Sequence, residues 1–213
     1  SNQVPGKRVD YTLREGVGVT AHMATWNYPF QLAGRSLEAE LACGNTAVIK
    51  PSKTTPLSAL YYGKDDEAAG LTEGVVNVVP GRGSEAGSAL AEHPDVDHVA
   101  FTGSTDVGKG IAHAAADSVT GVTLELGGKG PNVVFPDADL AAAAKGVHYG
   151  IVRNCGQMCW AGSRSLVHED VRDAVVDRVA ERAEAPPRGG GINDDGRRGP
   201  AGSEPQRRGS LRA

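Results

Sequence analysis

Five short β-rich runs alternate with helix-sized segments over the first 126 residues, and this alternation constrains the fold more than any other feature of the chain. Strands joined by helical connections run parallel to one another, with the helices packed on both faces of the sheet. The sequence therefore predicts a doubly wound, Rossmann-like α/β domain. The expected strands are residues 17–23, 47–49, 75–79, 98–101 and 122–126.

Two of the connecting helices can be recognised from the spacing of apolar residues. Phe30, Ala33, Leu37 and Leu41 lie three or four residues apart, and Gly44 is a typical helix stop. The helical pattern of residues 57–69 also ends directly before a glycine. Both segments have the length that a crossover between parallel strands requires.

A second, looser run of strands and helices follows the first. It predicts the start of another α/β domain over residues 127–184, which breaks off before its own sheet is complete. The expected strands are residues 132–135 and 165–168, and the expected helices are residues 139–152 and 169–184.

The two ends of the chain differ in composition from the rest. Residues 185–213 hold seven glycines, four prolines and six arginines, with Ile192 and Leu211 as their large apolar residues. Such a segment buries too little apolar surface to offset the entropy of ordering, so we expect a disordered tail, typical of a frameshifted or truncated reading frame. Residues 1–10 are polar, and we expect them to be a disordered start.

Charge and composition exclude several classes of function. A net charge of -4 with no basic stripe argues against a nucleic-acid partner. No apolar run approaches the roughly 20 residues that span a bilayer, which argues against a membrane protein. The three cysteines are an odd number, typical of cytoplasmic thiols, and the six histidines show no zinc-ligand spacing.

Two segments carry a carboxylate and a thiol that are suited to covalent catalysis. Glu125 lies in Leu-Glu-Leu-Gly-Gly-Lys at residues 124–129, and Cys159 lies in Gly-Gln-Met-Cys-Trp-Ala-Gly-Ser-Arg at residues 156–164. A thiolate is a strong nucleophile, and a carboxylate can deprotonate the water that releases what the thiol has captured. The pair predicts catalysis at sulfur followed by hydrolysis of a thioester.

These segments resemble the glutamate and cysteine signatures of the aldehyde dehydrogenase superfamily. Trp-Asn-Tyr-Pro-Phe at residues 26–30 resembles a third family segment, and the likeness covers about residues 11–183. It implies oxidation of an aldehyde to a carboxylic acid with NAD or NADP, through a cysteine thiohemiacetal and a thioester. The implied catalytic residues are Cys159 as nucleophile, Glu125 as the base for water, and Asn27 as oxyanion donor.

The resemblance also implies a cofactor site in the first domain, residues 11–126, which would be an NAD(P)-binding domain incomplete at its N-terminus. Lys53 stands where NAD-using relatives generally place a glutamate, and a lysine there favours a 2′-phosphate, as in NADP. Thr25 replaces a usual proline. The implied cofactor-binding residues are Trp26, Lys50, Ser52, Lys53, Gly81, Gly83, Ser104, Val107, Leu126 and Gly127.

Several alternatives stay open. Asn27 could be a plain turn residue, Lys53 an exposed lysine without a role, and Cys155 with Cys159 a redox pair. A coenzyme A-acylating enzyme is disfavoured by Glu125, which such relatives generally lack. The substrate neighbourhoods resemble those of enzymes for betaine aldehyde or other small aldehydes.

The main rival is a truncated, catalytically inactive fragment with at most residual nucleotide binding. A homo-oligomer is expected for the family, but not for a chain that lacks the strands through which the family assembles.

Overall fold

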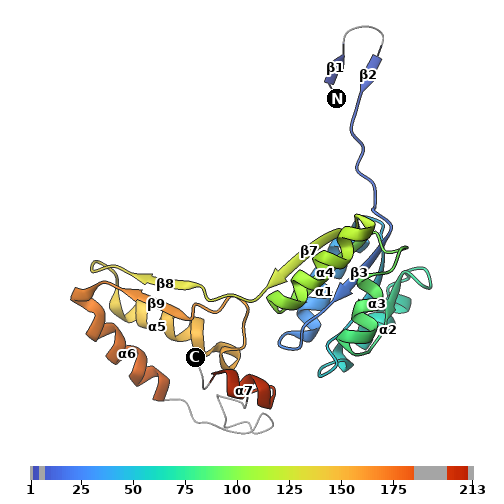
Figure 1. The fold of residues 1–213 in the computed structure, drawn as a ribbon. Coiled ribbons are helices and arrows are strands. Elements are labelled where there is room, and N and C mark those ends of the chain that lie inside the picture. Colours follow the sequence, from blue (N-terminus) through green and yellow to red (C-terminus); the bar gives the residue numbers. More distant parts are fainter. Residues whose placement is uncertain (1, 5–7, 185–200, 211–213) are drawn as a thin grey trace. The chain divides into compact units, whose positions relative to one another are not determined.

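The computed structural model describes residues 2–4, 8–184 and 201–210, and the chain divides into two compact units, Ser1–Leu126 and Gly127–Ala213 (Figure 1). Each unit contains its own buried apolar residues. Among the described helices, none combines the length and the apolar character that crossing a membrane requires.

Unit 1 is built on a five-stranded sheet in which every strand runs parallel to its neighbours. The strand order is β5-β4-β3-β6-β7, so the chain starts near the middle, moves to one edge and then crosses to the other. This arrangement confirms the predicted doubly wound α/β fold. The strands are β3 (Val19–Met23), β4 (Thr46–Lys50), β5 (Val76–Val78), β6 (His98–Gly103) and β7 (Gly121–Leu126).

Helices cover both faces of this sheet (Figure 1). The expected helix at 57–69 begins as a 3-10 turn, η1, and a π-helical turn, η2, precedes the third helix. The elements are α1 (Pro29–Ala42), η1 (Leu57–Ala59), α2 (Leu60–Ala68), η2 (Gly83–Gly87), α3 (Ser88–Ala91) and α4 (Thr105–Ser118).

Two apolar clusters hold these layers together. On one face, Leu37 of α1 packs with Ile49 of β4, and Tyr62 of α2 lies against the same cluster. On the other, Met23 of β3 packs with Ile111 of α4, and the cluster includes a buried residue of α3. Successive residues of a strand point to opposite faces, so the sheet separates an α1/α2 side from an α3/α4 side.

The ends of α1 and α4 show why these helices stop and start where they do. Gly44 follows α1 with φ of 81°, a left-handed conformation that suits glycine. Ser104 caps α4, and its side-chain oxygen accepts a long hydrogen bond of 3.5 Å from the Val107 backbone N–H.

Unit 2 is a small α/β layer. Its two strands are parallel, and Val134, Val147 and Val175 form the buried centre between the strands and the two helices. Asp139 caps the first helix by accepting from the backbone N–H groups of Ala141 and Ala142. The elements are β8 (Pro131–Val134), α5 (Leu140–Val152), η3 (Arg153–Gly156), β9 (Arg164–Val167), η4 (Glu169–Val171) and α6 (Arg172–Glu184).

The described parts of both ends differ from the expected disorder. Strands β1 (Asn2–Val4) and β2 (Arg8–Asp10) pair antiparallel, so the backbone groups of each strand find hydrogen-bond partners on the other. Helix α7 (Glu204–Ser210) is supported by ion pairs of Glu204 with the arginines three and four residues further on. The rest of the expected tail, 185–200 and 211–213, lies outside the described residues.

Candidate active site

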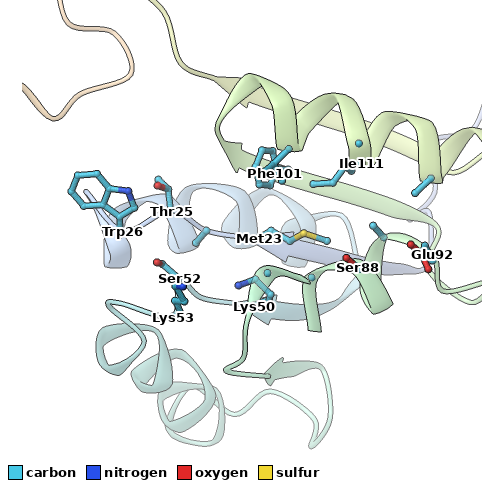
Figure 2. A pocket seen from close by; sticks show the side chains of 17 residues that line it. Met23, Thr25, Trp26, Lys50, Ser52, Lys53, Ser88, Glu92, Phe101 and Ile111 are labelled. Carbon is cyan, nitrogen blue, oxygen red and sulfur yellow. The ribbon is translucent and has the colours of Figure 1, made fainter. Parts of the chain in front are cut away.

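A cleft of about 500 Å³ lies on the α3/α4 side of the sheet in unit 1. It opens where β3 and β4 end, so it is lined by the last residues of these strands and by the segments that follow them. Figure 2 shows Lys50, Ser52 and Lys53 on one side of Met23, with Phe101 and Ile111 on the other. The cleft therefore has a polar wall and an apolar wall.

Six of the ten residues predicted to bind a cofactor line this cleft together. The neighbouring apolar residues Met23, Phe101 and Ile111 were not predicted, because they also belong to the apolar cluster and their pattern in the sequence is that of a core. The six predicted residues are Trp26, Lys50, Ser52, Lys53, Gly83 and Val107.

Lys50 is a buried polar group of the cleft. Its side chain is buried, and Nζ donates to the backbone oxygens of Pro51 at 2.8 Å and Gly81 at 3.5 Å. Burial lowers the pKa of Lys50. An ammonium has three donors, so this geometry leaves one N–H for a ligand hydroxyl.

Glycines give a ligand access to backbone in the same cleft. A Cβ built on Gly83 or on Gly110 would meet nothing within 4 Å, so the space beside each is open. Gly81 differs, because a Cβ there would lie 2.8 Å from the Ala86 side chain. Gly81 thus permits a tight turn and offers its carbonyl to Lys50, and it is not among the residues that line the cleft.

The other three predicted cofactor residues are not among those that line the cleft. Ser104 is occupied as the cap of α4. Leu126 packs closely on the same helix: a Cβ on Gly108 would be 2.6 Å from Leu126 Cδ2. Gly127 is the first residue of unit 2.

Glu125 lies on the α1/α2 side of the sheet. Leu124, the residue before it, packs in the cluster of the α3/α4 side, and alternation along β7 turns Glu125 to the other face. There Glu125 Oε1 accepts from Arg35 Nη2 of α1 at 2.6 Å. The sequence carried no signal for this pair, since 90 residues separate its members.

Asn27 lies in the short segment between β3 and α1, two residues before that helix begins. It is not among the residues that line the cleft, although its neighbour Trp26 is. Arg35 thus lies on α1 and Asn27 in the segment that leads into it. The predicted cofactor-binding residues lie mainly on the α3/α4 side of the sheet.

Cys159 lies in unit 2 on a loop with an unusual backbone. Asn154, Cys155 and Gly156 have φ angles of 50°, 56° and 75°, so three successive residues adopt the left-handed region. Strain of this kind is concentrated at functional sites and persists only where the surroundings hold it. Cys159 itself is partly buried, and its thiol is not part of a disulfide.

Hydrogen bonds brace this loop at two points. The Gln157 side-chain amide donates to the Asn154 carbonyl at 3.1 Å, and the Asn154 amide donates back to the Gln157 carbonyl at 3.3 Å. On the other side of the thiol, Asn132 Nδ2 donates to the Gly162 carbonyl at 2.6 Å. Asn132 was not predicted from the sequence, where it stands as one polar residue of a short strand.

The cleft of unit 1 is suited to binding a nucleotide, and the Cys159 loop of unit 2 is suited to carrying a nucleophile. The cleft offers an ammonium, hydroxyls and open backbone to a polar ligand, with apolar residues for a flat ring. Among the described residues, no group of three His, Cys, Asp or Glu side chains is arranged to hold a metal ion.

Comparison with known proteins identifies the family. Residues 1–212 match the sequence profile of the aldehyde dehydrogenase family. This match corrects the expected limits of 11–183, because it includes both ends of the chain. Among the relatives, the hydroxyisobutyraldehyde dehydrogenase of Mycolicibacterium austroafricanum is 49% identical over 85% of this chain and 36% of its own length. Human retinal dehydrogenase 2 is 48% identical over 84% of this chain and 35% of its own length.

Solved structures that resemble this chain belong to the same family. The NAD+ complex of an aldehyde dehydrogenase from Bacillus cereus has a TM-score of 0.90 and 45% identity, over 93% of this chain and 40% of that one. Betaine aldehyde dehydrogenase from Staphylococcus aureus, also with NAD+, has a TM-score of 0.87 and 38% identity, over 91% of this chain and 38% of that one. The chain spans about two fifths of the length of these proteins. It belongs to the aldehyde dehydrogenase family.

Proposed function

We propose that this chain oxidises an aldehyde to a carboxylic acid with NAD or NADP, through covalent catalysis at Cys159. The observation that carries the proposal is the cleft in unit 1, where six side chains and backbones expected to meet the cofactor gather around one cavity. Family membership supports the same reaction class, and NAD+ is bound in the two related structures described above.

The residues of the cleft fit a dinucleotide. The remaining donor of Lys50 and the hydroxyl of Ser52 suit ribose hydroxyls, and the open backbone at Gly83 admits a pyrophosphate. Lys53 is exposed at the same wall, and its positive charge would attract a 2′-phosphate. We therefore propose that NADP is accepted at least as well as NAD.

The chemistry that we propose begins with attack of the Cys159 sulfur on the aldehyde carbon. A C–S bond forms, the carbonyl π pair moves to oxygen, and the Asn27 amide donates to that oxygen. NAD(P)+, when bound, supplies the acceptor for the hydride that leaves the same carbon. The product on Cys159 is a thioester.

Hydrolysis then releases the acid. Glu125 takes a proton from water, the oxygen attacks the thioester carbon, and the C–S bond breaks to return the thiolate. Glu125 thus distinguishes this route from transfer of the acyl group to coenzyme A. We propose no particular aldehyde: two relatives are named for hydroxyisobutyraldehyde and retinal, which differ greatly in size.

The test is to follow reduced cofactor by absorbance with a small aliphatic aldehyde, using NAD+ and NADP+ in parallel and Cys159→Ala as the control. Turnover that is lost in the control supports the proposal, and addition of coenzyme A should not accelerate it. Folded protein that binds cofactor without turnover would instead support the rival, a chain with nucleotide binding alone.

A further inference from the structure

An ion pair joins α1 to the end of β7 although the two elements are not neighbours in the sheet. The apolar residues of α1 pack in the cluster that holds β4 and β5, whereas β7 is at the opposite edge, beyond β6. Arg35 nevertheless reaches Glu125, with 2.6 Å between Nη2 and Oε1. The guanidinium is therefore the contact of α1 with the carboxylate on β7.

This ion pair contributes little to holding the fold together. The two side chains are 59% and 48% exposed, and pairs at such exposure add little to stability because water screens them. α1 is already anchored by the buried residues Ala33 and Leu37. The contact is better suited to orienting the carboxylate than to securing the helix.

The geometry on the carboxylate is suited to a base. Arg35 engages Oε1 through one nitrogen, which leaves Oε2 to accept from water. A guanidinium is planar and always charged, so it restrains both the position and the direction of the oxygen that it binds. Asn27 lies two residues before the same helix, so the partner of the proposed base lies on α1 and the proposed oxyanion donor in the segment that leads into it.

We propose that Arg35 is a positioning residue for thioester hydrolysis: it holds Glu125 Oε1 so that Oε2 is presented to the attacking water. This inference rests on the proposed function. It assigns to Arg35 a role in the release of the acid and none in the attack by Cys159 or in hydride transfer.

The test compares Arg35→Gln, Arg35→Lys, Glu125→Gln and the Arg35→Gln/Glu125→Gln double variant by rapid mixing and by steady-state turnover. Arg35→Gln should keep the first burst of reduced cofactor while turnover falls by about ten- to a hundredfold, the loss expected when a reacting group is misplaced. Arg35→Lys should recover part of that loss. In the Glu125→Gln background, Arg35→Gln should cause no further loss.

Arg172→Gln is the matched control, because Arg172 also pairs with a carboxylate, that of Asp173 at 2.9 Å, on an exposed part of unit 2. It should leave both phases unchanged. Equal loss of burst and turnover in Arg35→Gln would overturn the inference, as would an undiminished effect of Arg35→Gln in the absence of Glu125.

Thermal unfolding of the parent chain, Arg35→Gln, Glu125→Gln and the double variant gives a measurement that does not depend on activity. If the ion pair forms, the two single substitutions should each lower the unfolding temperature by about 1–3 °C and the double variant should lower it by less than their sum. Strictly additive shifts would overturn the inference. A parent chain that shows this coupling but no burst would overturn the proposed function, and the catalytic role of Arg35 with it.

Discussion

Gly108 and Gly110 offer a sharp test of how α4 packs on the sheet. Both are glycines within the same helix, but a Cβ on Gly108 would lie 2.6 Å from Leu126 Cδ2, whereas a Cβ on Gly110 would meet nothing within 4 Å. Substituting each by alanine therefore makes the same chemical change in two different environments. The difference between the two variants isolates the contact between α4 and β7.

The magnitude follows from two opposing effects. Alanine in place of glycine within a helix stabilises by roughly 0.5–1 kcal/mol, and this gain is common to both variants. At Gly108 the new methyl group must displace the end of the Leu126 side chain, and overpacking of this kind costs about 1–3 kcal/mol. Gly110→Ala should thus raise the free energy of unfolding, and Gly108→Ala should be about 1–3 kcal/mol less stable than Gly110→Ala.

Urea unfolding without cofactor, followed by tryptophan fluorescence, provides the assay. The chain has two tryptophans, Trp26 in unit 1 and Trp160 in unit 2, so a Trp160→Phe background makes the signal specific for unit 1. Adding Leu126→Ala removes the side chain that the new methyl group would meet. In that background the two alanine variants should become nearly equal.

Equal stabilisation by Gly108→Ala and Gly110→Ala in the parent background would refute the reasoning, because it would show that α4 does not approach β7 as closely as described. A gap that persists after Leu126→Ala would refute it in another way. The close approach would then involve a group other than Leu126.

Three further outcomes are expected. Lys53→Glu should shift the ratio of kcat/KM with NADP to kcat/KM with NAD by about tenfold in favour of NAD, since it replaces attraction of a 2′-phosphate with repulsion. An unchanged ratio would show that Lys53 does not face the ribose. Asn132→Ala removes a hydrogen bond to the Gly162 carbonyl worth about 1 kcal/mol, which favours opening of the Cys159 loop by about fivefold. Alkylation of Cys159, followed by mass spectrometry over time, should accelerate by the same factor. Burial lowers the pKa of His22, so below its ordinary pKa of about 6.5 the unfolded chain binds a proton that the folded chain does not, and the free energy of unfolding should fall as the pH falls. His22→Gln should remove that part of the pH dependence in urea unfolding, and an identical slope in both proteins would contradict this assignment.

The strands and the doubly wound α/β class could be predicted because the relevant physics is local. Short β-rich runs, helical spacing and glycine stops such as Gly44 each restrict the backbone over a few residues, and the parallel sheet follows from their alternation. The polar residues of the cleft were predicted from the resemblance of their segment to the family. Lys50 ends β4, and Ser52 and Lys53 directly follow it, where side chains reach the carboxyl edge of the sheet.

The apolar lining and the ion pair could not be predicted, because they depend on distance in space. Met23 and Phe101 have the pattern of core residues, and nothing local shows that a cleft opens beside them. Arg35 is one charged residue on the exposed part of a helix until the fold brings Glu125 to it. Helix α7 carries ion pairs one turn apart, a signal that composition obscured in a glycine- and arginine-rich segment.

The register of β7 links the fold to the proposed chemistry. Its partners on β6 pair Leu124 with Phe101 and Glu125 with Thr102, so Leu124 faces the α3/α4 side and Glu125 faces α1. A slip of one residue would exchange the two faces, placing a carboxylate in the apolar cluster and a leucine beside Arg35. Burying an unpaired carboxylate is costly, so the apolar residues on either side of Glu125 exclude that slip. The same alternation predicts a division of effects: substitutions on α4 should change cofactor affinity, and substitutions on α1 should change the hydrolytic step.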